Sequence, residues 1–240
     1  MRTGNPALRT EAFAGSRSFD RAETMSVQGV VNKTLLLLCA TLLTASWVWK
    51  DPMRFVPFTM PVVLIALGLA FVTIFKKEWA AVTAPAYAAL EGLLLGCISA
   101  IFEKSYPGIV IQAVMLTFGV LFCLLMAYKS RLIKVTDNFR LGIVAATGAI
   151  ALFYVVNFVL GFFGIRIPLI HEAGPIGIGF SLFVVGIAAL NLVLDFDFIE
   201  RASEKGAPKY MEWYGAFGLM VTLIWLYFEI LILLSKIRRR

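Results

Sequence analysis

The sequence predicts an all-α membrane protein folded as a bundle of seven transmembrane helices. Of its 240 residues, 60% are apolar and only 15% are charged, and the mean hydropathy is +0.85. A soluble domain has about a quarter of its residues charged, so these charges are too few to cover a globular surface in water. The charged residues also divide the chain into apolar runs of roughly 20 residues, the helical length that crosses a hydrocarbon core of about 30 Å.

Residues 1–29 differ from the rest of the chain because they are polar and carry charges of both signs. They contain no short apolar stretch followed by a small-residue cleavage site, so a cleaved signal peptide is not expected. We therefore expect a polar cytoplasmic tail at residues 1–29 and a seven-helix transmembrane domain at residues 30–240.

Charged or helix-ending residues bracket each of the seven apolar runs. Only Glu91, in the third run, and Glu229, in the seventh, interrupt them with an acid. In chain order the runs lie within Lys33–Lys50, Arg54–Lys76, Glu78–Glu103, Lys104–Lys129, Arg140–Arg166, Gly174–Leu194 and Trp213–Ser235.

The basic residues of alternate connections predict the orientation of the helices. Fourteen Lys and Arg residues lie in the N-terminal segment up to Lys33 and in the second, fourth and sixth connections, and four lie in the first, third and fifth. Because basic residues are enriched in cytoplasmic loops, we expect the N-terminus in the cytoplasm. The basic segment 236–240 does not fit this pattern, so the last helix either spans with this cluster or re-enters the membrane.

Neither the net charge nor the cysteines indicate a soluble partner or a bound metal. The net charge of +7 comes from residues between and beyond the apolar runs, where they meet anionic lipid headgroups, so nucleic acid is not an expected partner. Cys39, Cys97 and Cys123 lie inside apolar runs without the ligand spacing of a metal site. We therefore expect no disulfide framework and no cofactor.

Four acids lie where the sequence predicts membrane: Glu91, Asp195, Asp197 and Glu229. An ionisable side chain at this depth costs at least a few kcal/mol, so by default it faces protein or water and marks an ion path. From the first connection to the sixth, every Lys or Arg lies in a connection, which leaves none inside a run to neutralise these acids. Simpler interpretations are a solvated helix-end acid for Asp197, a hydrogen-bonded structural residue for Glu91, and a partner of Lys236 for Glu229.

Small residues spaced four apart predict close contacts between helices in lipid. Gly92-x-x-x-Gly96 in the third run and Gly177-x-x-x-Ser181 in the sixth run have this spacing. We expect tight packing at both places.

Several short strings carry a resemblance to a known family. They are Tyr87-Ala-Ala-Leu-Glu91-Gly92-Leu-Leu-Leu-Gly96, Leu194-Asp195-Phe-Asp-Phe-Ile199, Leu226-Tyr227-Phe228-Glu229 and the opening Asn5-Pro6-Ala7-Leu8. Together with the seven runs, they resemble the Bax inhibitor-1 (transmembrane BAX-inhibitor-motif) family, in its bacterial branch, over nearly the whole chain. The resemblance implies a central C-terminal helix and a bacterial inner membrane as the location.

The resemblance also implies a pH-sensitive calcium leak channel. In the family, acids on the last two helices form a carboxylate pair that senses pH and gates the leak, and the matching residues are Asp195 and Glu229. Ca²⁺ is then the transported ion, bound transiently by this pair, and Glu91 and Asp197 belong to the ion path or accept protons. The second acid is Glu where the better-known members have Asp.

Electrostatics and helix register bear on this pair in opposite directions. Two adjacent carboxylates favour a shared proton, and without it they separate or admit a hard cation such as Ca²⁺. In a hairpin that turns at Gly206-Ala207-Pro208, however, Leu219 is level with Asp195, and ten further residues to Glu229 span about 15 Å. The pair therefore requires that the extra residues form a surface segment or that Met211–Gly218 lie outside the spanning helix.

Other function classes fit the sequence less well. A non-conducting regulator that binds other membrane proteins, such as a quality-control protease, is the alternative, and membrane lipid is a partner in either case. No enzyme activity or small-molecule substrate is expected, because Gly177-Ile-Gly179-Phe180 lacks the acid of an intramembrane aspartyl protease and the only histidine, His171, lies in a connection. A retinal protein is excluded because the seventh run has no lysine before Lys236.

Overall fold

A computed structural model describes residues 24–164 and 174–239 of the chain. Seven helices in this part are long and apolar enough to cross a membrane, which confirms the predicted fold class. They are formed by α2 (Val27–Trp49), α4 (Thr59–Phe75) together with the short segments before it, α5 (Ala80–Ser105), α6 (Ile109–Lys129), α7 (Asp137–Phe162), α9 (Pro175–Glu204) and α10 (Met211–Arg239). The short segments α3 (Pro52–Phe55), η2 (Val56–Phe58) and η3 (Lys77–Trp79) precede α4 and α5. His171 and residues 1–23 of the expected tail lie outside the described residues.

The helix ends follow from local chemistry. The hydroxyls of Ser26 and Thr136 accept hydrogen bonds from backbone N–H groups three residues later, at 2.9 and 3.2 Å, and so cap α2 and α7. Pro175 is the first residue of α9, where its missing N–H has no intrahelical partner to lose. Before α6 the chain turns at Gly108, whose φ of 79° favours glycine.

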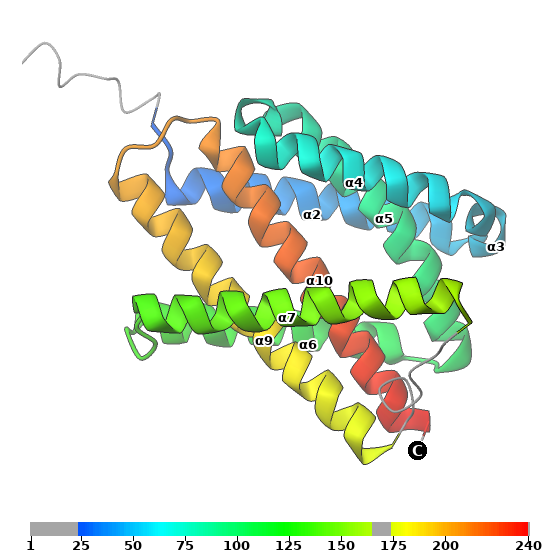
Figure 1. Cartoon of the computed structure of the whole chain (residues 1–240). Coiled ribbons are helices and arrows are strands. Elements are labelled where there is room, and N and C mark those ends of the chain that lie inside the picture. Colours follow the sequence, from blue (N-terminus) through cyan, green and yellow to red (C-terminus); the bar gives the residue numbers. More distant parts are fainter. Residues whose placement is uncertain (1–23, 165–173, 240) are drawn as a thin grey trace, which may run out of the picture.

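The last helix lies at the centre of the bundle, as the resemblance implies. On one side of it α5 packs against α2 and α4, and on the other side α9 packs against α6 and α7. α10 crosses between these groups and contacts α2, α5, α6 and α9 (Figure 1). It also contributes more buried residues than α2, α4, α5, α6 or α9.

α10 is one continuous helix that crosses the bundle from end to end. Near its start Glu212 accepts a hydrogen bond from the Ser26 amide at 3.0 Å, and near its end Arg238 donates to the Pro107 carbonyl at 2.7 Å. Ser26 precedes α2 and Pro107 follows α5, so these contacts lie at opposite ends of the bundle. The structure thus shows a last helix that spans the bundle and does not re-enter. Residues 211–218 belong to this helix and do not form a separate surface segment.

The sixth helix is longer than the sequence predicts. We expected it to end at Leu194, but α9 continues to Glu204 and turns into α10 within six residues. Asp195 and Asp197 therefore lie inside a helix and not at its end. The physical reason at Asp197 is that two arginines, described below, compensate the charge that we took as an end signal.

Glycines let α5 approach α2 closely, as the small-residue spacing predicts. A Cβ at Gly92 would lie 2.3 Å from the Thr41 carbonyl oxygen, and a Cβ at Gly96 would lie 2.6 Å from that of Ala45. The positions in contact advance together along both chains, so α2 and α5 run in the same direction. This contact fixes the position of Glu91, the residue before Gly92.

Candidate functional site

Two of the predicted acids line one cavity within the bundle. The cavity measures about 470 Å³ and is formed by side chains of α5, α7, α9 and α10. We call it the carboxylate cavity; its polar and aromatic lining comprises Tyr87, Glu91, Tyr154, Phe180, Ser181, Trp225, Phe228, Glu229 and Lys236. Glu91 and Glu229 come from helices that are distant in sequence, and the fold brings them to the same space.

Aromatic side chains hold both glutamates by hydrogen bonds. The Tyr87 hydroxyl donates to Glu91 Oε1 at 2.7 Å. Glu229 Oε1 accepts from the Tyr154 hydroxyl at 2.8 Å and from the Trp225 indole N–H at 3.1 Å. A hydroxyl or indole donor can serve the carbonyl oxygen of a neutral acid as well as a carboxylate. These bonds therefore orient the acids without fixing their charge, which a guanidinium partner would do.

Lys236 supplies a positive charge to the same cavity. It lies two helical turns after Glu229, so both side chains occupy one face of α10. Its ammonium donates to Ser181 Oγ at 2.7 Å and to the Gly177 carbonyl at 3.2 Å, and it attracts the Glu229 carboxylate electrostatically. Gly177 and Ser181, where we expected a small-residue contact between helices, thus bind the ammonium of Lys236. Carbonyl and hydroxyl oxygens of this kind are also ligands for hard metal cations.

Asp195 lies at a different level from Glu229. Its carboxyl interacts with the Thr222 hydroxyl, as the register argument leads one to expect. Thr222 precedes Glu229 by seven residues, about 10 Å along the helix. The structure therefore gives the two acids separate partners and does not bring them together. Their pairing stays a prediction that would require α9 to shift along α10 by about two turns.

The Asp195 carboxyl also contains a buried atom that lacks a hydrogen-bond partner. Among the described residues, Oδ2 is the only buried side-chain nitrogen or oxygen in this situation. Buried polar atoms are normally satisfied, and exceptions call for a functional or structural explanation. A proton, water or cation that visits this oxygen would supply one.

Asp197 is neutralised by two arginines, although we expected no basic residue inside an apolar run to do so. Arg140 Nη2 lies 2.7 Å from its carboxylate and Arg201 Nε lies 2.9 Å from it. Arg140 belongs to the first turn of α7. We had assigned it to the connection before this helix, and from this first turn it pairs with Asp197 of α9. The Asp197 side chain is only 8% exposed, which also rules out the solvated interpretation in this structure. Its place in an ion path stays a prediction, and the paired guanidinium groups count against it.

Sequence reasoning missed the aromatic partners of the acids. Tyr and Trp residues inside an apolar run look like packing residues, and Tyr154 comes from a helix far along the chain. A local signal existed, because Tyr87 precedes Glu91 by four residues and Trp225 precedes Glu229 by four. Residues four apart lie on one face of a helix, so both donors could have been assigned to their acids.

A further buried acid, Glu212, was also missed. It is 3% exposed and forms an ion pair with Lys33 of α2, and its Oε1 accepts from the Ser26 backbone and hydroxyl, both at 3.0 Å. The Met25 amide donates to the Ala207 carbonyl at 2.7 Å beside it. Glu212 therefore fastens the start of α2 to the start of α10, and its role is structural.

Comparisons with known proteins support the family resemblance. A comparison with curated proteins and a search of solved structures each found no match. The model of the family described as Bax inhibitor 1 like matches residues 5–239, nearly the whole chain. Seven apolar helices of spanning length agree with this match. The chain is thus an integral membrane protein that belongs to the Bax inhibitor 1 like family.

Proposed function

We propose that this protein is a pH-sensitive leak path for cations, Ca²⁺ among them. The observation that carries the proposal is the carboxylate cavity, in which Glu91 and Glu229 face one space inside a membrane protein. The family match supports a membrane protein of the Bax inhibitor 1 like family, and the conduction itself is our proposal. The sequence led us to expect Asp195 and Glu229 as a pair. The cavity instead groups Glu91 with Glu229.

The cavity offers the chemistry that a hard cation needs. Carboxylate and hydroxyl oxygens line it, the Gly177 carbonyl accepts from the lining Lys236, and Ca²⁺ takes six to eight oxygen ligands with flexible geometry. The carboxylates can compensate the penalty that an ion pays in a low-dielectric interior. Protonation at acidic pH removes that compensation. We therefore expect the leak to increase as the pH rises from mildly acidic to mildly alkaline.

Lys236 is proposed to close the path. Its ammonium occupies the Ser181 and Gly177 oxygens and acts as a tethered cation. An incoming Ca²⁺ must compete with this charge for the same oxygens and for Glu229. Asp195, with its unpartnered oxygen, is proposed as a second proton-binding group along α10, at the level of Thr222.

The test is Ca²⁺ flux into proteoliposomes at two pH values. We expect Glu91→Gln and Glu229→Gln each to lower the flux and to reduce its dependence on pH, because each keeps a hydrogen-bond acceptor and removes the negative charge. Glu78→Gln is the matched control, since Glu78 is exposed in η3 and lines none of the three cavities considered. Asp195→Asn tests the second proton-binding group.

Two results would reject the proposal. One is a wild-type flux equal to that of empty liposomes; if another membrane protein also co-purifies, the non-conducting regulator is favoured. The other is an unchanged flux and pH response in both Glu91→Gln and Glu229→Gln. We further propose the bacterial inner membrane with a cytoplasmic N-terminus, which labelling of a cysteine introduced before Met25 from either side of the membrane would test.

A further inference from the structure

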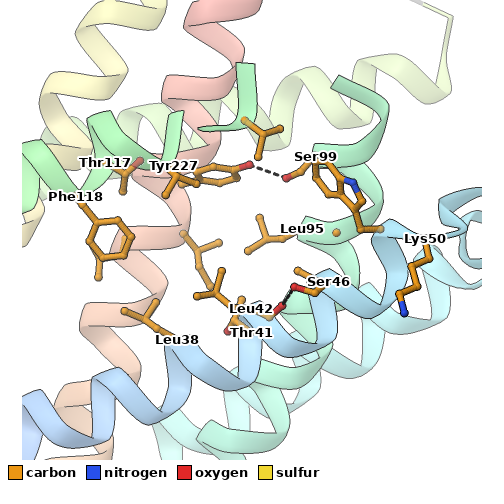
Figure 2. Close-up of a pocket in the computed structure, with 17 residues that line it drawn as sticks. Leu38, Thr41, Leu42, Ser46, Lys50, Leu95, Ser99, Thr117, Phe118 and Tyr227 are labelled. Carbon is orange, nitrogen blue, oxygen red and sulfur yellow. Dashed lines mark hydrogen bonds between the residues drawn. The ribbon is translucent and has the colours of Figure 1, made fainter. Parts of the chain in front are cut away.

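A second cavity, separate from the glutamates, lies between α2, α5, α6 and α10. It measures about 480 Å³, within the range of about 300–1,000 Å³ typical of ligand sites. Its lining is almost entirely apolar and includes none of Glu91, Glu229 and Lys236. We call it the apolar cavity; Figure 2 shows the side chains that surround it.

The apolar cavity opens sideways towards the lipid. Its rim includes Leu42 and Phe118, which are 57% and 46% exposed, and the exposed Ser46. Its floor includes Thr41 and Leu223, which are buried against the centre of the bundle. A flexible apolar chain in the membrane can therefore enter between α2 and α6 without any part of the protein unfolding.

The depth of the cavity matches one leaflet. Lys50, which follows the last residue of α2, lies at one end of the cavity, and Leu38 and Phe118 lie at the other (Figure 2). Leu38 precedes Lys50 by twelve residues of α2, about 18 Å of helix. This length is comparable to the thickness of one leaflet, which is half of a hydrocarbon core of about 30 Å. An acyl chain with its headgroup at the level of Lys50 thus has the length to fill the cavity.

The polar end of the cavity suits an anionic headgroup. Lys50 and Trp49 both line it there, and Lys and Trp are typical of the membrane interface. Arg54 adds a second positive charge in the following turn and Asp51 a single negative one, so segment 50–54 has a net positive charge. A phosphate in this position is attracted electrostatically, as at other basic membrane-surface sites.

The groove continues into the other half of the bundle. A smaller cavity of about 260 Å³ shares Leu38, Phe118 and Leu223 with the apolar cavity, and its lining also includes two charged residues, Lys129 and Glu200. The space between α2 and α6 is therefore mainly apolar along its length and has a lysine in the lining of each half, but an acid, Glu200, also lines the second lysine's half. This pattern fits a bilayer lipid better than an apolar partner helix.

We propose that the apolar cavity binds one acyl chain of an anionic phospholipid, with the phosphate at Lys50. The site is independent of cation conduction. The bound lipid would be structural. It would fill the gap between α2 and α6 and pack against α10, on the side away from α7 and α9.

The experiment is native mass spectrometry of delipidated protein mixed with phosphatidylglycerol and phosphatidylcholine. Two pairs of variants separate the acyl chain from the headgroup. Ser46→Trp fills the cavity from its rim, and Leu43→Trp places the same side chain on a neighbouring surface position that is 72% exposed and outside the cavity. Lys50→Gln removes the proposed phosphate partner, and Lys104→Gln removes an exposed lysine at the end of α5, outside both cavities.

We expect the wild type, Leu43→Trp and Lys104→Gln to retain one phosphatidylglycerol in preference to phosphatidylcholine. Ser46→Trp should retain neither. Lys50→Gln should still bind a lipid, but with a preference for phosphatidylglycerol about fivefold lower, the factor for one basic side chain near an anionic surface. Lipid retention by Ser46→Trp equal to the wild type, or an unchanged preference in Lys50→Gln, would overturn the proposal. The proposal would also be overturned if a membrane protein co-purified with the wild type, and Ser46→Trp abolished the binding of that protein without changing lipid binding.

Discussion

Replacing Gly92 by alanine should loosen the contact between α5 and α2. The added Cβ would lie 2.3 Å from the Thr41 carbonyl oxygen, and ordinary contact begins near 3.4 Å, so α5 must retreat by about 1 Å. Overpacking of this kind costs about 1–3 kcal/mol. The Thr41 hydroxyl shares its one proton between the Leu37 carbonyl at 3.0 Å and the Ala88 carbonyl at 3.1 Å, and the same movement removes the second acceptor, a further loss of at most about 1 kcal/mol. Alanine regains about 1 kcal/mol of helix propensity. The expected net loss is about 2 kcal/mol.

The assay is reversible unfolding in mixed micelles, followed by circular dichroism as the fraction of denaturing detergent increases. Gly179→Ala is the control, because a Cβ at Gly179 meets nothing within 4 Å. It should leave stability unchanged or raise it slightly through helix propensity. Equal stability of Gly92→Ala and the wild type would refute the packing argument, and so would equal losses in the two variants.

Three further changes test other parts of the structure. Asp197→Asn should cost about 2 kcal/mol in the same assay, between the values for surface and buried ion pairs, since its arginine partners are almost half exposed. Glu212→Gln should cost about 3 kcal/mol by leaving Lys33 without its buried partner, and should speed hydrogen exchange of the Ser26 amide that donates to it. Lys236→Met should raise Ca²⁺ flux into proteoliposomes, because no tethered ammonium then competes for the cavity oxygens; an unchanged flux would contradict the closing role.

The sequence was sufficient for the seven spans because hydrophobic length is a local property. It failed where charge compensation is non-local. Asp197 looked like a helix end because its partner Arg140 lies 57 residues earlier, and only the packing of α7 on α9 brings them together. The same holds for Tyr154, which reaches Glu229 across 75 residues. Register, in contrast, could be worked out from the chain: the estimate that Asp195 lies near Leu219 agrees to within one turn with its partner Thr222.

The candidate site could be predicted as a set of acids but not as a cavity. Glu91 and Glu229 stood out because each interrupts an apolar run. That they share one space depends on how closely α5 approaches α2 and on the path of α10 through the bundle. No pattern within either helix contains this information. The sequence offered Lys236 as a partner of Glu229, and the structure agrees with their attraction, but its contacts with Ser181 and Gly177 of α9 could not be read from the chain.

The partners of the membrane acids distinguish structural from exchangeable charges. Asp197 and Glu212 each bind basic side chains near one end of the bundle, and such ion pairs keep their charge and hold helices together. Glu91 and Glu229 are instead held by hydroxyl and indole donors, and Lys236 of the same cavity attracts the Glu229 carboxylate. We propose that a mobile species, a proton or a metal cation, supplies the charge compensation that these hydrogen bonds do not provide. The position of these two acids at one cavity is therefore the reason to look there, and not at Asp197, for the proposed ion path.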